Sequence, residues 1–184
     1  MPDYGRVKRL VSAISVMRET HDHHGERVAV LARDLAVAAG LPSCQVKLIE
    51  VGAHIHDIGK VLVRRELLNA PRKLTESEVI EMRRHTELGW ALVEQAGFEP
   101  VICEIVRYHH ERYDGNGYPD HLPHQQIPLA ARIVGICDTY EALTSRRTYR
   151  EAYSPSFAKT YMQSDTGKLF DPELLDMFFS QVIK

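Results

Sequence analysis

The sequence predicts an all-α protein that folds as a single-domain helical bundle of 184 residues. Apolar residues recur at helical spacing, capping signals bound the apolar stretches, and no segment alternates apolar and polar residues as a half-buried strand does. A chain of this length can bury a sizeable core in one domain. We therefore expect one domain over residues 1–184. Its core should lie between about residues 20 and 172, with a short helix before it and helices that close the chain.

The first two predicted helices are separated by Gly40, whose conformational freedom suits a helix end. Apolar residues three and four apart define the first helix, over residues 25–40. Pro42 stands near the start of the second helix, where its missing N–H is tolerated. We expect this second helix to continue as far as Asp57, because the apolar residues and Asp57 follow related turns.

The middle of the chain predicts two more helices and a loop. Thr75 and Glu78 form a capping box at the start of a helix that we expect to run unbroken to Gly97. Another helix is predicted over residues 99–112. Residues 113–128 are rich in Gly, Pro, Asp and Asn, a composition typical of a loop.

The C-terminal part predicts a helix over residues 129–147 and two closing helices. The pairs Ser154-Pro155 and Asp171-Pro172 each combine an N-cap residue with a proline at the first helical position. Each closing helix is therefore expected to begin at its proline.

The composition excludes several classes of protein. Hydrophobic residues make up 44% of the chain and charged residues 26%, as in ordinary soluble globular proteins. The formal net charge of −2 argues against binding to nucleic-acid polymers or membrane surfaces. No apolar run approaches the roughly 18 residues of a membrane span, and the N-terminal stretch lacks the apolar region of a signal peptide. Three separated cysteines without a CxxC pair are typical of a reduced protein, so we expect a cytoplasmic location.

Seven residues of metal-ligand type fall in or near five predicted helices, and they include two pairs of chain neighbours. Imidazole with carboxylate suits Fe, Mn, Zn, Ni or Co, and no thiolate cluster points to structural zinc. Seven ligands are too many for one ion that also binds water and substrate, but they suit two ions about 3.5–4 Å apart. Asp57 is the candidate for the carboxylate that both ions share. The candidates are His24, His56, Asp57, His85, His109, His110 and Asp138.

Five stretches of the sequence together resemble the HD-GYP domain family. They are HGER (24–27), HDIGK (56–60), His85, HHERYDGNGYP (109–119) and DTYEALTSRRTYR (138–150). A His-Asp pair alone is weak evidence, whereas the pattern HHExxDGxGYP is highly specific. The resemblance runs from about residue 20 to Pro172. It implies a helical metalloenzyme of bacterial cytoplasmic signalling that hydrolyses the second messenger cyclic di-GMP.

The resemblance also implies roles for individual residues. The seven ligand-type residues match the family's metal ligands, and Lys60 matches the lysine that faces the scissile phosphate. Asp57 and Lys60 are therefore the expected catalytic residues, and two divalent ions, Fe or Mn, are the expected cofactors. The residues expected to bind substrate are Lys60, the phosphate-gripping pair Arg147 and Arg150, and the loop residues Gly117, Tyr118 and Pro119.

The sequence departs from the family pattern at three places. Some members carry a Glu one turn before the first His, where it helps to hold a third metal. Thr20 stands there in this chain, and because Thr is a poor ligand we expect two metals. The usual Asp-Ala-Leu reads Glu141-Ala142-Leu143, and the usual Arg-Pro-Tyr reads Arg147-Thr148-Tyr149. Neither of these last two changes removes a metal ligand.

Two other functions stay open on the sequence. An HD-type phosphohydrolase of mononucleotides would use one metal, and the second doublet and the GYP loop count against it. A receptor without turnover would bind cyclic di-GMP or dock a GGDEF-type cyclase or another signalling protein, and the complete ligand set counts against it. The product, linear pGpG or GMP, is also open, as is the choice between cyclic di-GMP and a mixed cyclic GMP-AMP dinucleotide.

Overall fold

The computed structural model describes residues 23–68, 70–146 and 151–183. In these ranges the protein consists of α-helices, short 3-10 and π segments and loops, and the extended pairs are isolated bridges. The predicted all-α fold is confirmed. The helices are α2 (His24–Ala38), α3 (Ser43–His54), α4 (Arg65–Leu68), α5 (Glu76–Arg83), α6 (His85–Gln95), α7 (Pro100–Tyr108), α8 (Leu129–Thr144), α9 (Pro155–Ser164) and α10 (Pro172–Met177).

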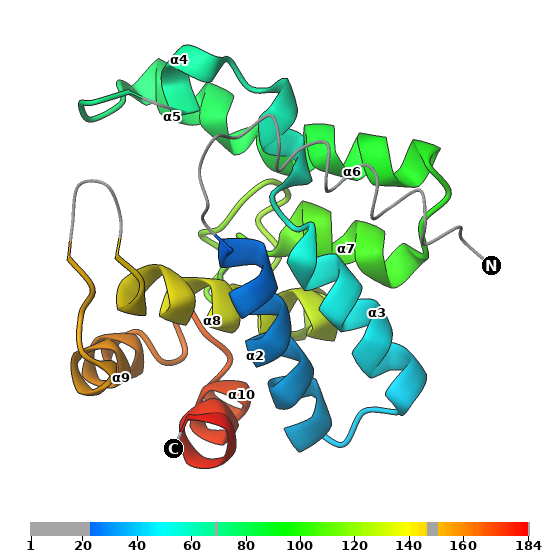
Figure 1. Ribbon diagram of the computed structural model, residues 1–184, viewed down its shortest axis with the longest axis vertical. Coiled ribbons are helices and arrows are strands. Elements are labelled where there is room, and N and C mark those ends of the chain that lie inside the picture. Colours follow the sequence, from blue (N-terminus) through cyan, green and yellow to red (C-terminus); the bar gives the residue numbers. More distant parts are fainter. Residues whose placement is uncertain (1–22, 69, 147–150, 184) are drawn as a thin grey trace.

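Helices α2, α3, α7 and α8 form the centre of the bundle, and α6 packs on its outside. Helix α2 packs against α3 and α8, and α7 packs against α3, α6 and α8. Figure 1 shows α4 and α5 at one end of the molecule and α9 and α10 at the other. The remaining short segments are the 3-10 helices η1 (Ile58–Leu62) and η2 (His124–Gln126) and the π segment η3 (Phe178–Val182).

Several helix ends lie where the sequence predicts them. Thr75 caps α5 and forms the predicted capping box with Glu78. The side chains of Ser154 and Asp171 accept hydrogen bonds from the first backbone N–H groups of α9 and α10. Gly40 follows α2 with a φ of +73°, a conformation that glycine adopts without strain.

Helix α3 ends at His54, so the prediction that it continues to Asp57 is wrong. His56 and Asp57 lie in a tight turn, in which the N–H of Ile58 donates to the carbonyl of Ile55 at 2.9 Å. The Nδ1 of His56 donates to the carbonyl of Ala53 at 2.7 Å. A side chain that binds a carbonyl of the preceding turn competes with the backbone donor of a continuing helix.

Two further helices end or break earlier than predicted at candidate ligands, and α8, predicted to reach residue 147, ends at Thr144. The helix expected from Thr75 to Gly97 is interrupted at Arg84, so that His85 begins the separate helix α6. The helix expected to reach residue 112 ends at Tyr108. In both places a histidine ring donates to a backbone carbonyl of the preceding turn, as at the end of α3.

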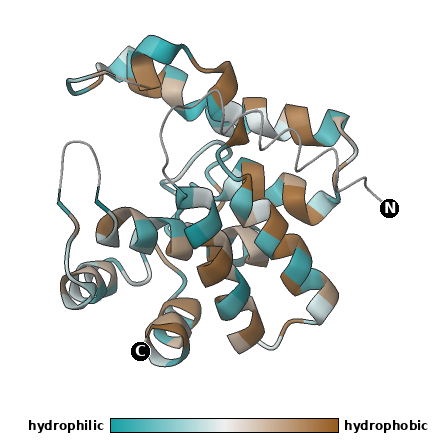
Figure 2. Ribbon diagram, viewed as in Figure 1, coloured by the Kyte–Doolittle hydropathy of each residue, from teal (hydrophilic) through white to brown (hydrophobic). Residues whose placement is uncertain are grey.

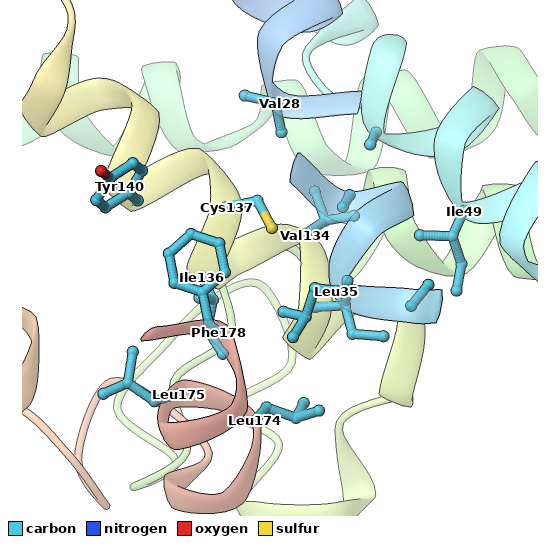
Figure 3. Close-up of a cluster of buried hydrophobic side chains, with 14 of the residues drawn as sticks. Val28, Leu35, Ile49, Val134, Ile136, Cys137, Tyr140, Leu174, Leu175 and Phe178 are labelled. Carbon is cyan, nitrogen blue, oxygen red and sulfur yellow. The ribbon is translucent and has the colours of Figure 1, made fainter. Parts of the chain in front are cut away.

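Two buried clusters of apolar side chains hold the helices together. Figure 2 shows that the helices carry both polar and apolar residues around their circumference, and each apolar stripe can face a neighbour. The larger cluster joins α2, α3, α8 and the C-terminal helices. Figure 3 shows its members Leu35, Val134 and Phe178 beside the ribbon of α8. The smaller cluster includes Ile102 and Val106 of α7 and packs them against the turn after α3.

Glycines allow the segments that carry candidate ligands to touch. A Cβ at Gly59 would lie 1.9 Å from the carbonyl oxygen of His85, and one at Gly135 would lie 2.9 Å from that of His109. Because side chains are excluded at these distances, only glycine permits the contact. The turn after α3 therefore lies directly on α6, and α8 lies directly on the end of α7.

Candidate metal centre

Four of the predicted ligands form one group where α6 and α7 meet the turn after α3. Single ligand atoms from Asp57, His85, His109 and His110 all lie within 4.8 Å of one another. The Nε2 atoms of His85 and His109 lie 3.4 and 4.0 Å from Oδ1 of Asp57. The side chains of these two histidines are only 2% and 0% exposed. We call this group the closed half of the centre.

The other predicted ligands gather where α2 and α8 meet the same turn. Ligand atoms of His24, His56 and Asp57 lie within 4.8 Å of one another. Oδ1 of Asp138, on α8, lies 3.1 Å from Nε2 of His24 and 3.8 Å from Nε2 of His56. We call His24, His56 and Asp138 the open half, because the side chains of His24 and Asp138 are 18% and 17% exposed. Asp57 belongs to both groups of ligand atoms.

Backbone carbonyls orient three of the histidines. The Nδ1 of His56 donates to Ala53, that of His85 to Met82 at 2.8 Å, and that of His109 to Ile105 at 3.0 Å. Metal-binding histidines in proteins are oriented in this way through the second ring nitrogen. This arrangement turns each Nε2 toward the centre.

Four buried polar atoms converge without hydrogen-bond partners in the described part of the chain. They are Nε2 of His56, His85 and His109 and Oδ1 of Asp57. Buried polar atoms in folded proteins are almost always hydrogen-bonded, so a convergent set of unpaired ones requires another partner. Imidazole nitrogens and carboxylate oxygens are good ligands for divalent transition metals. The residues therefore fit the metal ions that the sequence predicts.

Glu141 orients His24, a role that the sequence analysis did not assign. Its carboxylate accepts a hydrogen bond from Nδ1 of His24 and is only 3% exposed. Arg27 donates to the same carboxylate at 2.6 Å, and Ser145 also donates to it. Glu141 stands three residues after Asp138 on α8, which places both carboxylates on one face of the helix. That spacing is the signal that could have identified it.

The charges differ between the two halves. Burial alone would lower the pKa of His24, but its hydrogen bonds to Asp138 and Glu141 raise this pKa to about 9. Burial lowers the pKa of His110 to about 4 and also lowers the pKa values of His85 and His109. At neutral pH the ring of His24 is therefore positively charged in the metal-free protein, with both nitrogens protonated, while the closed-half rings are neutral.

Lys60 lies beside the shared carboxylate, on η1. Its ammonium group forms an ion pair with Oδ2 of Asp57, and its side chain is 26% exposed. Burial would raise the pKa of Asp57, but Lys60 and the surrounding histidines hold it well below its usual value. Asp57 is therefore a carboxylate, and Lys60 stands at the solvent side of the centre, where a substrate would arrive.

The loop that contains Gly117, Tyr118 and Pro119 covers the closed half. The ring of Tyr118 lies 4.9 Å from that of His110, centroid to centroid, and a cis peptide bond joins Tyr118 to Pro119. A Cβ at Gly117 would lie 2.5 Å from Cα of Glu111, so this glycine lets the loop fold back on its own start. The buried Glu111 carboxylate closes the loop by accepting from the N–H of Asp120 at 2.7 Å. The sequence alone does not predict this role of Glu111.

The predicted substrate-binding pair Arg147 and Arg150 lies outside the described residues. So does Thr20, the residue on which the expectation of two rather than three metals depends. The short helix expected before residue 20 lies outside them as well. In the described ranges, no helix has both the length and the apolar composition needed to span a membrane.

Comparison with known proteins assigns the chain to a family. The HD domain model matches residues 9–174, so the chain belongs to the HD domain family. Curated relatives of the chain also confirm its resemblance to the HD-GYP domain family.

Three curated relatives illustrate this kinship. The Cyclic di-GMP phosphodiesterase response regulator RpfG of Xanthomonas campestris is 42% identical over 82% of this chain and 40% of its own length. The Cyclic di-GMP phosphodiesterase of Thermotoga maritima is 34% identical over 94% of this chain and 48% of its own. The 3'3'-cGAMP-specific phosphodiesterase 2 of Vibrio cholerae is 30% identical over 93% of this chain and 33% of its own. The chain thus spans less than half the length of these relatives.

A solved structure shares the fold. The HD domain of the Listeria monocytogenes phosphodiesterase PgpH, in complex with cyclic-di-AMP, superposes with a TM-score of 0.65. The match covers 92% of this chain and 91% of that one, at 18% sequence identity. It establishes the helical HD fold.

Proposed function

We propose that this chain is a metal-dependent phosphodiesterase that hydrolyses cyclic di-GMP to pGpG, GMP or both, in the bacterial cytoplasm. The observation that carries the proposal is the convergence of seven ligand-type residues. Six of them supply two groups of ligand atoms that share Asp57, and Asp138 lies 3.1 Å from His24. Two curated relatives whose printed names are cyclic di-GMP phosphodiesterases support the choice of substrate.

We assign one divalent ion to each half of the centre, with Fe or Mn as the metal. His85, His109 and His110 would hold the ion of the closed half, and His24, His56 and Asp138 that of the open half. Asp57 would bridge the two ions. When bound, such ions neutralise the charge of a phosphodiester and make water a stronger nucleophile near neutral pH.

The chain's own groups then orient the substrate. Lys60 is held beside Asp57 by their ion pair, so its ammonium group can donate to a phosphate oxygen or to the oxygen that leaves. Carbonyls fix the rings of His56, His85 and His109, so the ligand atoms need little rearrangement before reaction. Arg147 and Arg150 are proposed to hold the phosphate that is not cleaved.

Product analysis tests the proposal. Protein loaded anaerobically with Fe(II), or loaded with Mn(II), is incubated with cyclic di-GMP and the products are separated by chromatography. We expect linear pGpG or GMP well above a control with metal alone. Recovery of intact cyclic di-GMP after long incubation would instead identify a receptor. Hydrolysis of mononucleotides in place of cyclic di-GMP would identify a plain HD-type phosphohydrolase.

A further inference from the structure

A cavity of about 290 Å³ adjoins the closed half of the metal centre. Four parts of the chain enclose it: the loop after α7, one face of α8, the residues just before α10, and Arg83 at the end of α5. His109 and His110 form part of its wall, so a ligand in the cavity would touch the metal-binding residues. Pockets for whole small molecules usually measure about 300–1,000 Å³. This cavity therefore suits one part of a cyclic dinucleotide, such as a single base.

The wall of the cavity suits a base better than a phosphate. Ile127, Ile136 and Phe170 contribute apolar surface, which favours the flat faces of a purine. The other charges in the wall are largely paired: Arg132 binds Asp171, Arg112 binds Asp114, and Glu111 accepts from the backbone, so they offer little net charge to a phosphate.

One arginine in the wall is free to bind a ligand. Arg112 and Arg132 line the cavity, but each is bound to a carboxylate. Arg83 is exposed, and the structure records no carboxylate bound to it in the described ranges. Its guanidinium carbon lies 4.9 Å from the centroid of the Tyr118 ring, so the ring supports the planar group next to the cavity.

We propose that Arg83 recognises a guanine base of the substrate, which occupies this cavity beside Tyr118. A guanidinium fork can donate two parallel hydrogen bonds to the N7 and O6 acceptors of guanine. Adenine carries an amino donor where guanine carries O6. Its amino group would therefore face an N–H donor of the guanidinium, and the second hydrogen bond could not form. The inference rests on the proposed function, because it requires that a cyclic dinucleotide reach the metal centre, and it names the base that the site selects.

Binding measurements on three variants test this assignment. The ligands are hydrolysis-resistant phosphorothioate analogues of cyclic di-GMP and cyclic di-AMP, titrated calorimetrically into the Mn-loaded protein. We expect Arg83→Ala to weaken binding of the cyclic di-GMP analogue by about 5- to 150-fold, the range for a bidentate arginine–guanine pair. Binding of the cyclic di-AMP analogue should be unchanged. Arg83→Lys should recover only part of the loss, because an ammonium group is a point charge rather than a fork.

Arg84→Ala is the matched control. It removes the same charge from the neighbouring position, but Arg84 is exposed and does not line the cavity, so both affinities should stay at the wild-type value. Equal losses for the two analogues in Arg83→Ala would overturn the proposal and identify a phosphate contact. An unchanged affinity for the cyclic di-GMP analogue would also overturn it. Turnover of unmodified cyclic di-GMP is measured separately, so guanine-selective binding without turnover would refute the proposed function alone.

Discussion

The two halves of the candidate metal centre differ in the contact that orients His24 in the open half, because His56, like His85 and His109 in the closed half, is oriented by a nearby carbonyl. In the closed half, His85 and His109 donate to carbonyls three and four residues earlier in the chain. In the open half, His24 donates to Glu141, which lies 117 residues later. The closed half therefore depends on local backbone geometry. The open half combines one such local contact, from His56 to Ala53, with one that depends on the packing of α2 against α8.

The halves also differ in what a metal must displace. The closed-half rings are buried and neutral, so their nitrogens can bind an ion directly. The charged ring of His24 points Nε2 at Asp138 and Nδ1 at Glu141. Because its pKa is about 9, a metal that binds Nε2 must displace the proton there. The comparison predicts that the closed half binds its ion more tightly at neutral pH.

The largest effect should follow from the loss of Asp57, because it is the residue that the two halves share. We expect Asp57→Ala to weaken the binding of both ions by more than about 100-fold. Mutating a residue that only hydrogen-bonds to a metal ligand already lowers metal affinity by up to about 100-fold, and a direct ligand should matter more. Hydrolysis of cyclic di-GMP should fall to background. Metal analysis after gel filtration measures the first effect, and Asp176→Ala, at an exposed carboxylate on α10, is the control. Retention of one full metal equivalent would show that Asp57 does not bridge.

Removal of one histidine from each half should separate the halves. His109→Ala is expected to remove the closed-half ion, and His24→Ala the open-half ion. Each variant should therefore retain about one metal equivalent per chain while hydrolysis is lost, since the proposed reaction needs both ions. Metal content and turnover are measured on the same samples. Loss of two equivalents in both variants would mean that the ions bind as one cooperative unit.

Glu141 offers a smaller change that is confined to the open half. Glu141→Gln keeps the size of the side chain but removes the charge that holds His24 in place. We expect the affinity of one metal to fall by about 10- to 100-fold, the usual effect of losing a carboxylate behind a histidine ligand. The other metal should bind as before. Glu87→Gln, on the exposed face of α6, is the control, and competition with a coloured chelator measures the affinities.

The difference between the halves also explains what the sequence could predict. The turns of the closed half contain both the ligand and its orienting carbonyl within a few residues, so short motifs identify them. In the sequence Glu141 is visible only as a departure from the family pattern, because its contact with His24 depends on how two distant helices pack. The overall fold was predictable because apolar periodicity and capping residues are local signals.

The helix ends at the ligands were not predictable from periodicity. The apolar pattern continues through the turn at Asp57, where Ile55 and Ile58 are buried, and no break in it marks the interruption at Arg84. The ends follow from ring-to-carbonyl hydrogen bonds, which leave no trace in the spacing of apolar residues. The sequence gives no sign of the role of Arg83 for a similar reason, because its cavity is assembled from four separate parts of the chain.

The smallest expected effect is a difference in pH dependence between the two halves. Free histidine has a pKa of about 6.5, and in the folded metal-free protein that of His24 is raised to about 9. This group therefore contributes stability that is fully present below about pH 6.5 and is lost as the pH rises to about 9. The closed-half histidines have lowered pKa values, so their contribution has the opposite sign and is lost as the pH falls.

Metal binding should report the same contrast. Between pH 7 and 9 the affinity of the open half should rise by up to about tenfold per pH unit, because each ion bound there displaces the His24 proton. The closed half should change little over this range, since its rings are already neutral. Titration of Mn(II) in two buffers of different ionisation enthalpy counts the protons released at each step. In His24→Ala the pH-dependent step should vanish. Equal proton release by the two steps would show that the halves do not differ in the way that their hydrogen bonds suggest.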